Sequence, residues 1–76
     1  MEKYSNKSGD SGITHYKIGK DYITILFKNK LDKYIYSTAK IDKKHITKMK
    51  QLALSGKGLS SYISQHPEVK ENYIKG

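Results

Sequence analysis

The chain of 76 residues contains no cysteine and no arginine. Without cysteine it has no disulfide framework and no thiolate ligands for zinc or an iron–sulfur cluster. We expect a cytoplasmic location, because nothing in the composition indicates an oxidising compartment. Without arginine, the forked side chain that reads guanine edges and grips single phosphates is missing. Sequence-specific recognition of DNA bases is therefore disfavoured.

Long apolar stretches are missing as well. No apolar run follows residues 1–7, so we expect neither a secretory signal peptide nor a membrane span. A chain of this length fits one domain, and such a domain buries only about 60% of the surface that its unfolded form exposes. Most apolar residues are then needed for folding, and any binding site should be shallow.

The charge is strongly one-sided. Fifteen lysines stand against seven aspartates and glutamates, which gives a formal net charge of +8. Such a balance predicts an anionic partner. The alternative is that the lysines form only a solvated surface, because net charge by itself reports on solubility and non-specific association.

Two regions of the chain differ in composition and hydrophobic periodicity. Residues 1–12 are rich in serine and glycine and show no hydrophobic periodicity, which predicts a disordered N-terminal tail. Residues 13–76 have the pattern of a single folded domain. Its first part holds three segments rich in β-branched and aromatic residues, namely Ile13–Ile18, Tyr22–Phe27 and Tyr34–Thr38. Turn residues at 19–21 and 29–32 join them into a predicted antiparallel β-meander.

The middle predicted strand has one apolar face. Ile23, Ile25 and Phe27 alternate with the other residues of this strand and fall on the same side of the sheet. We expect that face to meet the helices that follow. The predicted fold class is therefore α+β, with a three-stranded antiparallel β-meander followed by two or three short helices packed on one face.

A helix is predicted from Lys43 to about Ser55. Asp42 can cap its first turn, Ile41 and Ile46 can form a hydrophobic staple across the cap, and Gly56 can end the helix in a left-handed conformation. Its apolar stripe consists of Ile46, Met49, Leu52 and Ala53. A second short helix is expected over 60–65, and Pro67 can begin a last turn or two.

The order of these elements resembles the KTSC domain, which is named for its occurrence at the C-terminus of some lysyl-tRNA synthetases. The resemblance rests on Tyr34-Ile35-Tyr36, on Ala53-Leu54-Ser55-Gly56 and on a second short helix at 59–63. It implies a compact α+β module, found alone or appended to larger proteins in bacteria and their phages. It also implies a part in nucleic-acid transactions and no established catalytic role.

Catalytic and metal-binding patterns are weak. His15, His45 and His66 lie far apart in the sequence, so no pair has the close helical spacing of a metal site. Gly56-Lys57-Gly58 lacks the first glycine and the Ser or Thr of a Walker A loop. No nucleophile can be paired with a base from the sequence. We therefore expect no enzyme, no metal and no cofactor, with each histidine at the surface or partly buried.

Lysines of the predicted helix are candidate phosphate contacts. Lys43 and Lys44 stand in the first turn, where they oppose the helix dipole, and Lys44 and Lys48 form a like-charge pair four residues apart. No glutamate on that face compensates them. This cost favours a binding face over a merely solvated one. The full set of candidate lysines is Lys43, Lys44, Lys48, Lys50 and Lys57.

Tyrosines offer a second kind of contact. Tyr34 and Tyr36 share one face of the third strand and can form a stacking platform for unpaired bases, which Tyr22 would join if it lies away from the apolar face. The alternative is that these rings close a thin core with their hydroxyls at its rim.

The sequence thus predicts a small, non-enzymatic binding module, monomeric or weakly dimeric. Its expected partner is a nucleic acid, with the lysines on phosphates and the tyrosines stacking on bases. The alternative is a protein-binding adaptor, or a phage-encoded inhibitor that docks on an acidic partner surface. In that case the open edge of the three-stranded sheet could accept a partner strand.

Overall fold

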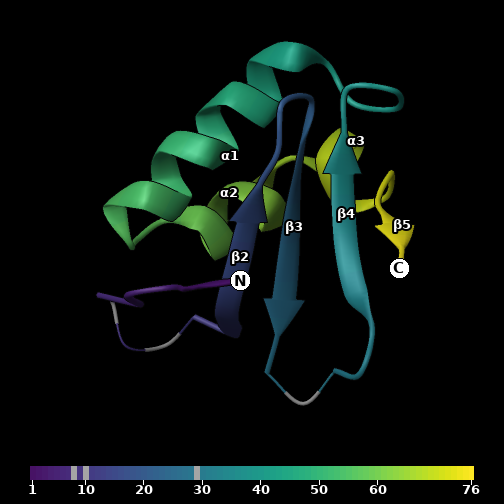
Figure 1. Cartoon of the computed structure of the whole chain (residues 1–76). Coiled ribbons are helices and arrows are strands. Elements are labelled where there is room, and N and C mark those ends of the chain that lie inside the picture. Colours follow the sequence, from purple (N-terminus) through teal and green to yellow (C-terminus); the bar gives the residue numbers. More distant parts are fainter. Residues whose placement is uncertain (8, 10, 29) are drawn as a thin grey trace.

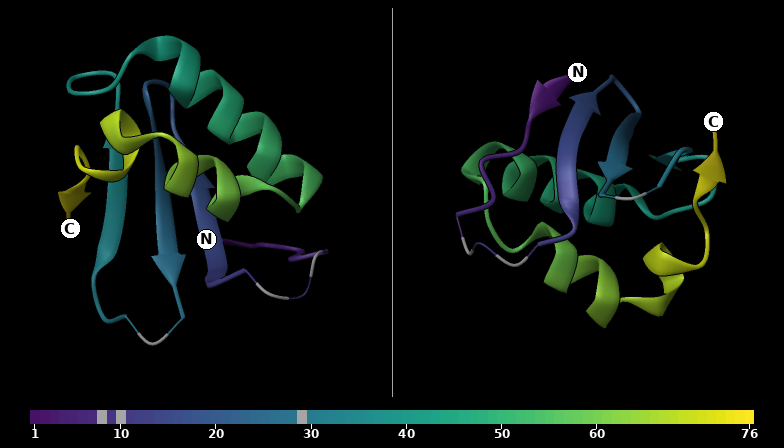
Figure 2. Two further views of the ribbon diagram at one scale, coloured as in Figure 1. Left: turned by 180° about the vertical axis from the view of Figure 1, so that it is seen from behind. Right: turned by 90° about the horizontal axis from the view of Figure 1, so that it is seen from below.

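A computed structural model describes residues 1–7, 9, 11–28 and 30–76 and confirms an α+β fold. The elements in chain order are β1 (Glu2–Lys3), β2 (Ile13–Ile18), β3 (Tyr22–Phe27), β4 (Lys33–Ser37), α1 (Lys43–Ser55), α2 (Leu59–Gln65), α3 (Pro67–Lys70) and β5 (Ile74–Lys75). The helices lie together on one side of the sheet, behind it in Figure 1 and in front of it in the left view of Figure 2.

The sheet is antiparallel and its strands follow chain order from β1 to β5. The predicted meander of β2, β3 and β4 is confirmed as its centre. Two strands that the sequence did not predict are added, β1 outside β2 and β5 outside β4. Each has only two residues, which is too short for an alternating pattern to be recognised.

The two faces of the sheet differ as the alternation in β3 predicts. Ile23 and Ile25 are fully buried against the helices. Tyr22 and Leu26 lie on the opposite, open face and keep part of their surface exposed. Thr24, at the centre of that open face, is only 7% exposed, because side chains of the neighbouring strands lie over it.

Helix α1 begins and ends as predicted. The carboxylate of Asp42 accepts a hydrogen bond from the backbone N–H of Lys44 at 3.0 Å, and Ile41 and Ile46 on either side of the cap are both buried. Gly56 follows with φ of 82°, and its N–H donates to the carbonyl of Leu52.

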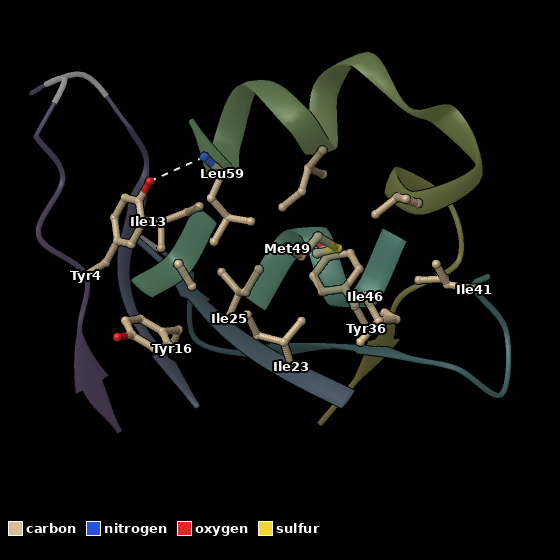
Figure 3. Packing of buried hydrophobic residues seen from close by; sticks show 13 residues of the cluster. Tyr4, Ile13, Tyr16, Ile23, Ile25, Tyr36, Ile41, Ile46, Met49 and Leu59 are labelled. Carbon is tan, nitrogen blue, oxygen red and sulfur yellow. Dashed lines mark hydrogen bonds between the residues drawn. The ribbon is translucent and has the colours of Figure 1, made fainter. Parts of the chain in front are cut away.

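The apolar stripe of α1 is confirmed in most positions. Ile46, Met49 and Ala53 are buried in the core, as Figure 3 shows for the first two. Leu52 is only half-buried and packs at the edge of this cluster. His45 is buried instead, on the same side of the helix.

The shorter helices complete the core. Leu59 begins α2 and Val69 lies in α3, and both side chains are fully buried. Pro67 takes the first position of α3, where its missing N–H costs no hydrogen bond. Helix α2 follows Gly58, which has no side chain and so cannot cap it.

The N-terminal segment differs from the predicted disordered tail. Glu2 and Lys3 pair with β2, and Tyr4 is 3% exposed with its ring edge-on to Tyr16. The hydroxyl of Tyr4 accepts a hydrogen bond from the N–H of Leu59 at 3.3 Å, drawn as a dashed line in Figure 3. Ser8 and Asp10 of the expected tail, and Asn29 of the expected loop, lie outside the described residues.

The sequence missed this because Tyr4 is a single aromatic residue among polar neighbours. Its partners are far away in the chain, so no local periodicity reveals that it is buried. The N–H of Lys7 adds a second long-range bond, to the carbonyl of Gly56 at 2.8 Å. The folded domain therefore includes residues 2–7.

We predict that Tyr4 is a core residue in solution. Replacement by alanine should lower the free energy of unfolding by about 3–5 kcal/mol, as for other large buried rings. Tyr4→Phe keeps the ring but leaves the buried N–H of Leu59 without its acceptor, which should cost about 1–3 kcal/mol. Urea titration measures both. Equal stability of Tyr4→Ala and the parent would contradict the burial of Tyr4 and support the prediction of a disordered tail.

We also predict that two apolar residues of α1 differ sharply in how much they contribute to the free energy of unfolding. Met49 is fully buried, so Met49→Ala should cost about 2–5 kcal/mol. Leu54 is 69% exposed on the same helix, and Leu54→Ala should change stability by no more than about 0.5 kcal/mol. Thermal and urea unfolding of the pair check the orientation of α1. Similar losses in both variants would contradict it.

Candidate functional site

Three lysines of α1 form an exposed surface, which we call the lysine surface and define as Lys43, Lys44 and Lys48. At 100° per residue they occupy the arc opposite the buried stripe. The helix contains no Asp or Glu, and none stands in its first turn. Among the described residues, no carboxylate forms an ion pair with these lysines.

Lys50 lies on the same helix but is only partly exposed. Its ammonium group donates a hydrogen bond at 2.9 Å to the carbonyl of Lys20, in the turn between β2 and β3. This bond holds α1 to one end of the sheet. A phosphate contact by Lys50 would therefore compete with a contact inside the protein.

Lys57 lies in the corner between α1 and α2, at the far end of α1 from Lys43. The two positions are about 20 Å apart along the helix axis. Gly56 and Gly58 on either side have φ of 82° and 83°, and the Lys57 side chain is exposed. The N–H of Leu59 already bonds to the Tyr4 hydroxyl, so this corner does not offer that group to an anion.

The structure places Tyr34 and Tyr36 on the core side of the sheet. They pair across the strands with Ile25 and Ile23, and therefore share the face that the helices cover. Tyr36 is 2% exposed and has no free ring face on which a base could stack. It fills the core, as in the alternative that the sequence left open. Tyr34 is half-buried, with its ring against Phe27.

The three tyrosines considered for a stacking platform do not share a face. Tyr22 stands on the open face, while Tyr34 and Tyr36 lie on the opposite side. Tyr34 and Tyr36 also lie on a different element from the lysine surface. The structure thus assembles the predicted lysines on α1, but it does not join the predicted tyrosines to them.

Burial has an electrostatic consequence for Tyr36. Loss of hydration raises the pKa of its hydroxyl well above the ordinary value, and the neighbouring Tyr34 and Tyr73 raise it further. Tyr36 therefore remains a neutral phenol throughout the physiological range.

A polar cluster between the helices was missed by the sequence analysis. Nδ1 of His45 in α1 and the hydroxyl of Tyr62 in α2 are hydrogen-bonded at 2.7 Å. Nε2 of His45 lies 3.7 Å from a carboxylate oxygen of Glu68 in α3. His66 stacks on Tyr62 at 4.0 Å and donates from Nδ1 to the Tyr62 carbonyl. The cluster joins the three helices through polar contacts.

Two signals could have indicated this cluster. Tyr62 and His66 are four residues apart, a spacing that brings side chains together on a helix. His45 falls beside the apolar stripe when α1 is turned at 100° per residue.

Burial raises the pKa of Tyr62, and the nearby Glu68 carboxylate adds to this. The hydroxyl thus stays protonated as a partner for His45.

Within the part of the chain that the structure describes, His, Asp and Glu side chains do not gather in a group of three or more that could hold a metal ion. Within the same part, every helix is too short or too polar to cross a membrane.

We predict that stability falls with rising pH more steeply in the parent than in Tyr36→Phe. The unfolded chain loses the Tyr36 proton near pH 10, whereas the folded chain retains it to higher pH. A raised folded pKa stabilises the fold fully below about pH 10 and loses that contribution above it. The two slopes should differ by up to about 1.4 kcal/mol per pH unit. Urea titrations from pH 8 to 11 measure this, and Tyr22→Phe on the open face is the control. Parallel curves for the parent and Tyr36→Phe would contradict the burial.

Comparison of the chain with models of protein families, with curated proteins and with solved structures gave no match. The resemblance to the KTSC domain therefore stays a prediction from the sequence motifs.

Proposed function

We propose that the protein is a small, non-enzymatic, cytoplasmic module that binds nucleic acid through the lysine surface of α1. The observation that carries the proposal is the set of exposed lysines on a helix without acidic residues. Membership of the KTSC family, indicated by the sequence motifs, is part of the same proposal.

The placement of these lysines supports binding because it is unfavourable for the helix alone. Lys43 and Lys44 stand where the positive end of the helix dipole disfavours cations. Lys44 and Lys48 repel each other one turn apart. A helix that needed only solubility would gain stability from glutamates at these positions. A polyanion would offset this repulsion, because its phosphates attract both ammonium groups.

The chemistry of the surface indicates the kind of nucleic-acid contact. Lysine ammonium groups act as point charges on phosphates and do not read base edges in a bidentate way. The lysine surface, from Lys43 to Lys48, covers about 8 Å of the helix axis. Such a surface fits backbone contacts that are independent of base sequence. We propose that the protein binds in this way as a monomer or a weak dimer.

The competing function is docking on an acidic protein. Its strand-pairing form is disfavoured, because the edge strands of the sheet, β1 and β5, have only two residues each and offer a partner strand few backbone groups. Charge attraction to an acidic surface does not need a free edge, so the experiment below separates the two functions.

We predict a steep salt dependence of binding. Each phosphate neutralised releases condensed counterion, so three to four lysine contacts should give a slope of about −2 to −4 in log K against log salt. Fluorescence anisotropy with labelled single- and double-stranded DNA and RNA measures it. Lys44→Glu combined with Lys48→Glu should weaken binding to all sequences by at least about tenfold at low salt and flatten the slope. The stability of this double variant should stay the same or rise slightly, because a glutamate in the first turn interacts favourably with the helix dipole.

The matched control is Lys17→Glu combined with Lys33→Glu. Both residues are exposed on the open face of the sheet, and the net charge change equals that of the α1 pair. Its affinity should fall much less. Equal losses in the two double variants would show that net charge alone drives binding. A parent that binds none of the probes at low salt would refute the proposal and favour an acidic protein partner.

A further inference from the structure

A cavity of about 320 Å³ lies between strands β3 and β4 and the helices α2 and α3. We call it the aromatic pocket. Four of its lining side chains are aromatic rings, namely Phe27, Tyr34, Tyr36 and Tyr73. Its size is at the lower end of the range for small-molecule sites and fits one compact ligand. It shares no residue with the lysine surface, so it does not depend on the proposed function.

The rings of this pocket hold one another in place. Tyr34 and Tyr73 lie with centroids 4.5 Å apart, and Phe27 meets Tyr34 edge-on at 5.1 Å. Tyr73 also contacts Tyr36, at 6.3 Å. Mutually packed rings lose little freedom when a ligand binds. The pocket is therefore preformed for a flat, apolar group.

The charges around the pocket select the sign of the ligand. Lys30 and Lys70 line it, and no lining residue carries a carboxylate. The two ion pairs among the described residues involve neither of these lysines. An aromatic cage for an ammonium ligand would be opposed by both charges. An anionic ligand is favoured instead.

Two hydroxyl groups add polar contacts to the apolar lining. Ser60 and Ser64 lie one turn apart on α2 and both line the pocket. Neither hydroxyl is hydrogen-bonded to any of the described residues. They can form hydrogen bonds with the polar edge of a heterocyclic ring. A hydrocarbon chain has no such polar edge. This favours a heterocyclic ring over a fatty acid.

We propose that the aromatic pocket binds a nucleoside monophosphate. The base lies against Tyr34 and Tyr73, its polar edge meets Ser60 and Ser64, and the phosphate lies between Lys30 and Lys70. The same chemistry occurs in a free nucleotide and in an unstacked nucleotide at the end of a strand. Tyr34 then contacts a base, but beside lysines other than those on α1.

Isothermal titration with AMP, CMP, GMP and UMP tests this in the full chain. The monophosphates should bind at least about tenfold more tightly than the matching nucleosides, because the phosphate meets two cations. Inorganic phosphate alone should bind more weakly than the nucleotides, because it cannot stack. NMR shifts should concentrate on Tyr34 and Tyr73. Absence of saturable binding by any monophosphate and by terminally phosphorylated dinucleotides would overturn the proposal.

Variants of the lining residues test whether the nucleotide binds in the aromatic pocket. Lys30→Ala combined with Lys70→Ala should weaken monophosphate binding about tenfold while leaving nucleoside binding unchanged. Ser64→Phe, at an exposed position, should fill the pocket and abolish both. The matched control is Lys44→Ala with Lys48→Ala, which removes the same two charges on α1 and should bind monophosphates as the parent does. Loss in this control together with full affinity in the Lys30 and Lys70 variant would overturn the proposal. A parent protein that binds monophosphates but neither single- nor double-stranded nucleic acid would leave this proposal standing while refuting the proposed function.

The source of the ligand follows from two further probes. A free nucleotide is the source if monophosphates bind as tightly as phosphorylated dinucleotides. A strand end is the source if the dinucleotide binds more tightly and loses that advantage when its terminal base is removed. Competition by a fatty acid that matches the nucleotides in affinity would overturn the proposal, because it would show that the ring and hydroxyl contacts play no part.

Discussion

The hydrogen bond between the Tyr4 hydroxyl and the Leu59 N–H anchors the arrangement of the rest of the molecule. Helix α2 follows a glycine and has no side-chain cap, so its first N–H needs a partner from elsewhere. Tyr4 supplies that partner and closes one end of the core with its ring. Gly56 permits the approach, because a side chain there would come within 2.6 Å of Ser5. The N-terminal segment thereby sets where α2 begins, and α2 forms one wall of the aromatic pocket.

Polar contacts add to the apolar packing that positions the helices. A domain of this size has few residues to bury, so its helices depend on individual contacts for their placement. His45, Tyr62 and Glu68 join the three helices, and Lys50 holds α1 to the turn between β2 and β3. These contacts lie to the side of both proposed sites. They leave the remaining α1 lysines free to face outward and the rings of the pocket free to line it.

Local chemistry explains which features the sequence could predict. Asp42, Gly56 and the alternation in β3 act on their own neighbours, so the bounds of α1 and the central meander followed from them. The place of Tyr4, the two outer strands and the histidine cluster depend on partners distant in the chain. The face of the sheet also matters. Period-two alternation places Tyr34 and Tyr36 on the same face of β4, but it does not tell whether the helices cover that face. The helical period therefore predicted that Lys43, Lys44 and Lys48 share an exposed face of α1, but it did not predict the pocket that Tyr34 lines.

The two outer strands bear on how the protein behaves at high concentration. A sheet edge with unpaired backbone groups is a template for pairing with another copy. Here β1 and β5 present only two residues each, and each includes an exposed lysine, Lys3 or Lys75. Short strands and charged side chains at the edge oppose edge-to-edge pairing of two sheets. The short, charged edges thus oppose association through the sheet, and the lysines that attract polyanions also repel other copies of the chain.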